Sequence, residues 1–156
     1  QRPKPLSIKP VRRRLLTARC CLATALPALA LDFRSVVVPA AVLYDAPSNK
    51  AKKLYLIRAQ TPVEVVVRLE GWAKVRDAEG GLAWIEASQL TERRTVIVTV
   101  VGAELRQSPA ENAPLSASLA KWVVLDYVDT PAPGWVAVRH RDGLSGVVRA
   151  TQVWGL

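Results

Sequence analysis

The side chains that most often carry out catalysis are nearly absent from this chain. Histidine occurs once, at His140 in a predicted turn, and both cysteines, Cys20 and Cys21, lie in an N-terminal segment that we expect to be removed. The sequence contains no glycine-rich phosphate loop and no histidines at metal-ligand spacing. We interpret the scattered acids as solvated surface; examples are Glu64, Glu70 and Asp126. The sequence therefore predicts no catalytic residue, no metal and no cofactor.

The basic residues behind the net charge of +9 are concentrated at one end. Seven of the 22 lysines and arginines precede Cys20, whereas all 13 acidic residues follow Ala30. The chain after Ala30 thus has 15 basic and 13 acidic residues, a balance of +2. Binding to nucleic acid needs clustered cations, which such a near-neutral body lacks. We therefore expect no nucleic-acid partner.

The first 30 residues have the three parts of a secretory signal peptide. A cationic stretch ends at residues 12–14, an apolar run spans residues 20–30, and the small-x-small triplet Ala28-Leu29-Ala30 closes it. This run of 11 residues is well short of the roughly 20 that span a bilayer. We predict a signal peptide over residues 1–30, a mature chain without a membrane span, and a periplasmic or secreted location. The alternative is a disordered basic tail on a cytosolic protein.

The rest of the chain contains one unit twice. Gly71-Trp72-Ala73-Lys74-Val75-Arg76 recurs 63 positions later as Gly134-Trp135-Val136-Ala137-Val138-Arg139. Other landmarks keep an offset of 62 or 63, among them Leu43 with Leu105, Pro47 with Pro109, Gly81 with Gly143 and Gln89 with Gln152. Copies of about 60 residues are near the lower size limit for a domain that folds alone. Between the copies lie only residues 91–94.

Within each copy the pattern is typical of β-structure, because the apolar runs are short, rich in Val and Ile, and separated by turn residues. We expect strands at 63–67, 72–76 and 82–86 in the first copy, and at 122–128, 135–139 and 144–148 in the second. The segments 77–81 and 140–143 carry the acidic and glycine residues of hairpin turns. Short strands at this spacing favour a small barrel.

These motifs resemble those of the bacterial SH3-like (SH3b) domains. Leu105-Arg106-Gln107-Ser108-Pro109 is similar to the family's Arg-x-Gly-Pro-like loop, and Gly71-Trp72-Ala73-Lys74-Val75 to its Gly-Trp-x-Lys-Val strand. Gly81-Leu82-Ala83-Trp84-Ile85 and residues 87–90 resemble its last strand and closing turn. The resemblance covers nearly everything after Val36. It implies an all-β fold of two tandem small SH3-like β-barrels, at residues 36–90 and 95–156, that serve as binding modules.

The resemblance also implies candidate binding residues. In the distantly similar eukaryotic SH3 domains, aromatic side chains of a first-strand Ala-Leu-Tyr-Asp motif and of the third strand line the ligand groove. Val42-Leu43-Tyr44-Asp45 is similar to that motif, and Trp72 and Trp84 stand at the other aromatic positions. We therefore predict a groove formed by Tyr44, Trp72 and Trp84; packing in the core is the alternative for these side chains.

The second copy departs from this aromatic set. Arg106 stands in place of Tyr44 and Gly146 in place of Trp84, which leaves Trp135 as the one remaining candidate. If one copy binds, we expect it to be the first. The other large aromatics, Trp122, Tyr127 and Trp154, are interpreted as packing residues.

Three lysines suggest the charge of the ligand. Lys50, Lys52 and Lys53 lie in the loop where eukaryotic relatives place acids, and Glu86 stands where those relatives carry a proline. A basic loop beside an aromatic groove favours an anionic ligand, such as the carboxylates of murein stem peptides or an acidic segment of a partner. The alternative is a solvated loop whose lysines keep the protein soluble.

The functional prediction is a non-catalytic exported module that binds cell-wall peptidoglycan or its stem peptides. The alternative is a scaffold domain that binds another cell-envelope protein. A small hydrolase ranks below both. SH3-like modules often accompany Cys-His or metal-dependent wall hydrolases, but only three residues follow Val153, so we expect no catalytic domain.

Overall fold

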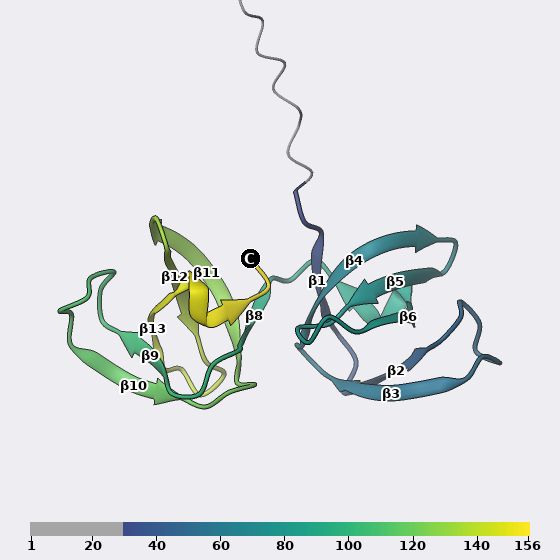
Figure 1. Ribbon diagram of the computed structural model, residues 1–156, viewed down its shortest axis with the longest axis horizontal. Helices are drawn as coiled ribbons and strands as arrows, with labels where there is room; N and C mark the ends of the chain where they lie inside the picture. Colours follow the sequence, from purple (N-terminus) through teal and green to yellow (C-terminus); the bar gives the residue numbers. More distant parts are fainter. Residues whose placement is uncertain (1–29) are drawn as a thin grey trace, which may run out of the picture.

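The computed structural model describes residues 30–156, so the predicted signal peptide lies outside the described residues except for Ala30. The described chain forms two seven-stranded antiparallel sheets and two short 3-10 turns, without an α-helix in that range. Figure 1 shows the sheets as two separate rolled-up bodies side by side. The predicted all-β fold of two tandem small barrels is confirmed.

The first barrel is formed by residues 33–91. Its elements are β1 (Phe33–Val36), β2 (Ala40–Tyr44), β3 (Lys53–Arg58), β4 (Pro62–Leu69), β5 (Trp72–Arg76), β6 (Leu82–Glu86), the 3-10 turn η1 (Ala87–Gln89) and β7 (Leu90–Thr91). In the sheet the strand order is β3-β2-β6-β5-β4-β1-β7. β3 and β7 are therefore the two edges of the sheet.

The second barrel repeats this plan over residues 95–154. Its elements are β8 (Thr95–Val98), β9 (Ala103–Arg106), β10 (Leu115–Leu119), β11 (Val124–Ala132), β12 (Trp135–Arg139), β13 (Ser145–Arg149), the 3-10 turn η2 (Ala150–Gln152) and β14 (Val153–Trp154). The order β10-β9-β13-β12-β11-β8-β14 is that of the first sheet, strand for strand. The sequence repeat is thus a structural repeat.

Each barrel closes around its own core of small and branched side chains. Alternate residues of a strand face opposite sides, and in β5 Ala73 and Val75 are fully buried while Trp72 and Lys74 face outward and are half-buried. The first core gathers Val36, Leu43, Val63 and Ile85 with smaller residues, and the second gathers Val98, Leu105, Leu125 and Val138. Neither buried cluster contains an aromatic side chain, although Tyr127 packs against the second one.

The two predicted hairpin turns are present. Asp77 N–H donates to Gly81 O over 3.0 Å, and His140 N–H donates to Leu144 O over 2.7 Å. Gly80 and Gly143 adopt left-handed backbone conformations there (φ +88° and +89°), which glycine reaches without strain.

A further left-handed turn occurs at one position of each copy. Gln60 has φ 66° and Trp122 has φ 72°, and they are the two non-glycine residues with positive φ between residues 30 and 156. Their N–H groups donate to equivalent carbonyls, Gln60 to Val36 O (2.7 Å) and Trp122 to Val98 O (2.8 Å). The predicted strand 122–128 is therefore wrong at its start, because Trp122 belongs to this turn and β11 begins at Val124.

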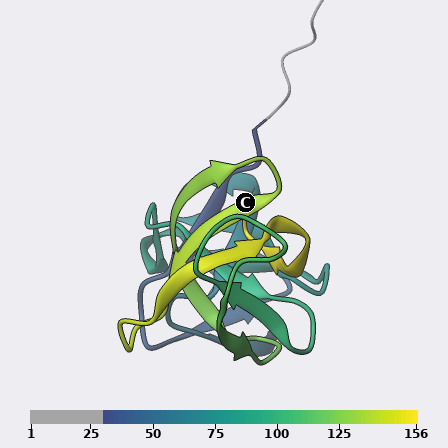
Figure 2. The same cartoon turned by 90° about the vertical axis from the view of Figure 1, so that its left-hand side faces the viewer.

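The two barrels are joined by side-chain contacts as well as by the chain. The Phe33 and Trp154 rings pack edge to face with centroids 4.9 Å apart. The Arg94 guanidinium lies 5.8 Å from the Phe33 ring and 5.4 Å from the Tyr127 ring, and it donates to Gly155 O at 2.9 Å. Figure 2 views the molecule from the side of the second barrel, which therefore stands in front of the first. These contacts fix one barrel against the other.

Candidate functional site

The three predicted groove aromatics of the first barrel lie together on its outer face. The Tyr44 and Trp72 rings meet edge to face, with centroids 5.5 Å apart and an interplanar angle of 86°. Trp84 of β6 is the strand partner of Tyr44 of β2. On the other side of β6, Lys74 of β5 pairs with Trp84 and holds its ammonium 6.0 Å from the Trp84 ring centroid. The sequence-predicted side chains therefore form one cluster.

The members of this cluster differ in how much they expose. Trp72 and Trp84 are half-buried, whereas Tyr44 is only 8% exposed because its aromatic neighbours cover it. Tyr44 therefore supports the two indoles and offers little surface of its own. The face available to a ligand consists mainly of Trp72 and Trp84.

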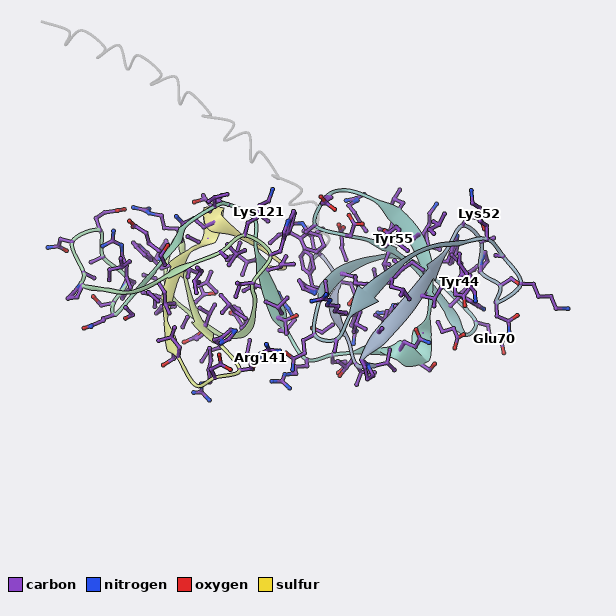
Figure 3. All side chains as sticks on the ribbon, turned by 90° about the horizontal axis from the view of Figure 1, so that it is seen from below. Tyr44, Lys52, Tyr55, Glu70, Lys121 and Arg141 are labelled. Carbon is purple, nitrogen blue, oxygen red and sulfur yellow. The ribbon has the colours of Figure 1, made fainter. Side chains whose placement is uncertain are left out.

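The three predicted lysines lie beside this cluster. Lys53 begins β3 and is the strand partner of Tyr44, and all three lysine side chains are exposed. The loop is held in shape because Lys52 N–H donates to Asp45 Oδ1 (3.1 Å) and Lys50 N–H to Ser48 Oγ (3.2 Å). Figure 3 shows Lys52 at the end of the first barrel that points away from the second. The loop thus adds positive charge next to the aromatic face.

The family of the chain follows from a match to both repeats. A family model described as "Bacterial SH3 domain" matches residues 37–92 and again residues 99–155. The chain belongs to the bacterial SH3 domain family. Domains of this family are binding modules, and this chain carries two of them in tandem.

Several solved structures are similar to this SH3 pair. NlpC2 from Trichomonas vaginalis is 15% identical, with a TM-score of 0.38 over 80% of this chain and 48% of its own. NlpC1 from the same organism is 14% identical, with a TM-score of 0.38 over 83% and 47%. An NlpC/P60 family protein from Bacillus cereus ATCC 10987 is 18% identical, with a TM-score of 0.35 over 78% and 55%. The chain spans about half the length of these structures. Among curated proteins, none matches it.

The strand register corrects the alignment of the two SH3 domains. Lys74 pairs with Trp84 in the first domain and Ala137 with Val147 in the second, so Val147 is the counterpart of Trp84. The prediction that Gly146 stands in place of Trp84 is wrong, because the offset along this strand is 63 and not 62. Gly146 corresponds to the buried Ala83 and faces inward.

The predicted binding residue of the second SH3 domain, Trp135, is covered. It is 8% exposed, and the Arg149 guanidinium lies 4.9 Å from its ring centroid. Arg149 is held in turn by an ion pair with Glu111. Arg106, the counterpart of Tyr44, donates to Ala113 O at 2.7 Å and pairs with Glu104. At the place where the first SH3 domain has exposed indole surface, the second SH3 domain therefore has two arginines, Arg106 and Arg149, each held by an ion pair.

Residues 30–156 contain no group of three or more side chains that could together hold a metal ion. Glu64, one of the three acids predicted to be solvated surface, is 9% exposed and accepts a hydrogen bond from Arg76 Nη1 at 2.9 Å. That interpretation of Glu64 is wrong, because β4 places it against β5. In this part of the chain no helix is long and apolar enough to cross a membrane.

Sequence analysis missed a second surface, between the two SH3 domains. Trp122, interpreted as a packing residue, is 41% exposed and lines a hollow of about 490 Å³ together with residues 56–61 of the first domain. Beside it, the Tyr55 hydroxyl donates to Asp77 Oδ2 at 2.7 Å. Burial and this hydrogen bond raise the pKa of Tyr55, so its hydroxyl stays a donor. The sequence around a tryptophan does not indicate whether its side chain is exposed or packed, so the exposure of Trp122 could not be predicted.

Proposed function

We propose that the chain is an exported module that binds the peptide stems of peptidoglycan through its first SH3 domain. The observation that carries this proposal is the Tyr44–Trp72–Trp84 cluster, which lies beside a loop with three exposed lysines. The second SH3 domain, whose Trp135 is covered, acts as a structural partner.

The chemistry of the cluster suits such a ligand. Half-buried indoles provide a large contact area at a small cost in side-chain entropy. The lysine ammonium groups attract carboxylates, which murein stem peptides carry, and direct them toward the indole faces. Tyr44 stabilises this face because its ring packs edge to face with that of Trp72.

We also propose that the protein acts without catalysis, in a periplasmic or secreted location. The matched family, whose domains are binding modules, supports the absence of catalysis, and the signal-peptide pattern of residues 1–30 supports the location. Turnover of labelled murein by the pure protein would contradict it. Fractionation of cells that produce the full chain tests the location, and recovery in the cytoplasm would overturn export.

Co-sedimentation with purified murein tests the binding proposal. The Lys50→Glu/Lys52→Glu variant is expected to lower the bound fraction about fivefold, since two attractive contacts of a few tenths of a kcal/mol become repulsive. Arg58→Glu/Arg141→Glu makes the same change in net charge away from the cluster and is expected to bind like the wild type. Equal losses in both variants, or no retention of the wild type, would overturn the proposal.

A further inference from the structure

We propose that the groove between the two SH3 domains binds an extended acidic segment of another protein, which adds a strand to the free edge of β3. The groove is lined by none of the residues assigned to peptidoglycan, and the part of the β3 edge that borders it is residues 55–58. This interaction holds or fails independently of that function.

The groove consists of two adjoining hollows between the domains. The first, of about 490 Å³, is lined by residues 56–61 of the first domain and by Ile97, residues 122–124, His140 and Arg141 of the second. The second, of about 180 Å³, is lined by Tyr55, Asp77, Ala78 and Glu79 as well. Both are lined by Leu56, Ile57, Thr61, Ile97 and Trp122. They therefore form one continuous groove along β3.

One wall of this groove is the edge of a strand. β3 is the outermost strand of its sheet and pairs with β2 alone. Successive side chains of a strand point to opposite faces, yet the consecutive residues 55–58 all line the groove. The backbone edge of β3 therefore borders the groove, and its outward N–H and C=O groups are a template for another extended chain.

The groove offers apolar anchors to such a chain. Leu56 is 67% exposed and Trp122 is 41% exposed, and they stand on opposite walls beside the buried Ile97. The left-handed turn places Trp122 at the groove, whereas the first copy has Gln60 at the same turn. Exposed tryptophan at the centre of a concave surface is the residue type that most often dominates binding energy.

The charges of the larger hollow select an acidic occupant. Its lining includes Arg58, His140 and Arg141 and no acidic residue, whereas Asp77 and Glu79 line the smaller hollow, where Asp77 accepts a hydrogen bond from the Tyr55 hydroxyl. Asp142 Oδ1 lies 4.0 Å from Arg141 Nε and offsets part of the Arg141 charge, and Asp142 Oδ2 lies 3.2 Å from His140 Nδ1. Between residues 30 and 156, Arg58 has no ion-pair partner. A segment that alternates carboxylate and apolar side chains would pair with the arginines of the larger hollow and also cover the apolar side chains of the groove.

The geometry of a strand edge favours a protein segment over murein. A regular antiparallel or parallel ladder needs a chain of L-residues that alternates its side chains. The stem peptides of murein contain D-residues and are short, so they cannot continue the β3 ladder. Both surfaces attract carboxylates, but the aromatic cluster of the first SH3 domain binds stem peptides and the groove binds an extended protein segment.

Binding of a synthetic peptide to the full protein chain tests this assignment. The probe is a fluorescent, end-blocked octapeptide of alternating glutamate and valine, and its binding is measured by anisotropy. The expected result is saturable binding with movement of the Leu56 amide signal in a ¹⁵N spectrum. A lysine–valine peptide, and a glutamate–valine peptide N-methylated at alternate residues, are expected to bind at least about tenfold more weakly.

Protein variants complete the test. Arg58→Glu/Arg141→Glu is expected to weaken binding of the glutamate–valine peptide at least about tenfold, and Trp122→Gln about fivefold. Glutamine is tolerated at this φ, since the first domain has Gln60 there. The Lys50→Glu/Lys52→Glu variant is expected to bind the peptide normally, although its bound fraction on murein falls about fivefold. No binding by the wild type, equal binding of the N-methylated peptide, or an unchanged Arg58→Glu/Arg141→Glu variant would overturn the inference.

Discussion

The hydroxyl oxygens of Ser35 and Thr95 lie 2.7 Å apart and join the first strand of one SH3 domain to the first strand of the other. Both residues are 1% exposed. Ser35 Oγ also lies 2.6 Å from Arg93 O, and Thr95 Oγ1 lies 2.6 Å from Gln60 O. Two hydroxyl protons are available for these three short contacts, so at most two of the contacts are linear hydrogen bonds at one time. The tandem pair is therefore a single unit in which loss of one hydroxyl affects both domains.

The substitution Thr95→Val removes the Thr95 hydroxyl without changing the shape of the side chain. The carbonyl of Gln60 then loses a donor in a buried place, and we expect a loss of about 1–2 kcal/mol in the free energy of unfolding. Urea unfolding followed by circular dichroism measures the change. Thr151→Val, at an exposed position of η2, is the control and is expected to have no effect. Equal stability of the Thr95→Val variant and the wild type would show that the junction hydroxyl is dispensable.

A methyl group added at Gly146 tests the corrected register. A Cβ there would lie 2.6 Å from Arg106 O and 2.9 Å from Leu105 Cγ, and the backbone oxygen cannot move aside. We expect Gly146→Ala to cost about 1–3 kcal/mol, in the range of other overpacked cores. Thermal unfolding measures this, with the exposed neighbour Ser145→Ala as the neutral control. A Gly146→Ala variant as stable as the wild type would contradict the inward orientation of this position.

The acid stability of the first SH3 domain is expected to depend on Asp32. Burial alone would raise the pKa of Asp32, but hydrogen bonds from Arg68 and Arg34 outweigh it, and the pKa lies below the ordinary value of 3.8. A lowered pKa in the folded state stabilises the fold above the ordinary value, and this contribution is lost as the pH falls through the folded value.

Asp32→Asn removes that pH dependence. At pH 7 we expect the variant to be less stable by about 0.5–1 kcal/mol, because the ion pairs are partly exposed. Below about pH 4 the difference should shrink as the wild type loses the same interactions. Unfolding at a series of pH values checks this, with the exposed Glu70→Gln as control. A difference that stays constant from pH 7 to pH 2 would refute the assignment to this carboxylate.

The sequence predicted the fold because the repeat and the strand pattern are local properties of the chain. Strands at 72–76, 82–86 and 135–139 were predicted with the ends that the structure has, since glycine and acidic turn residues mark their limits. The predicted strand that began at Trp122 was wrong because an unusual φ at a non-glycine residue leaves no trace in composition.

The candidate site was predicted less completely, because exposure depends on neighbours that are distant in sequence. Tyr44, Trp72 and Trp84 do cluster, but the coverage of Tyr44 by its neighbours follows from the pairing of β2 with β6. The same holds for Trp135, whose cover comes from Arg149 and a loop residue, Glu111. The groove between the domains depends on how the two barrels meet, which no motif within one repeat describes.

Binding of a stem peptide to the first SH3 domain can be followed through the indole N–H signals of the five tryptophans in ¹⁵N-labelled protein. A soluble murein stem peptide is titrated into the protein, and each signal is assigned by substitution. We expect the signals of Trp72 and Trp84 to move with one saturating dependence on ligand concentration, while those of Trp135 and Trp154 stay in place. Unchanged Trp72 and Trp84 signals at millimolar peptide, or movement at Trp122 alone, would contradict a peptidoglycan site on the first SH3 domain.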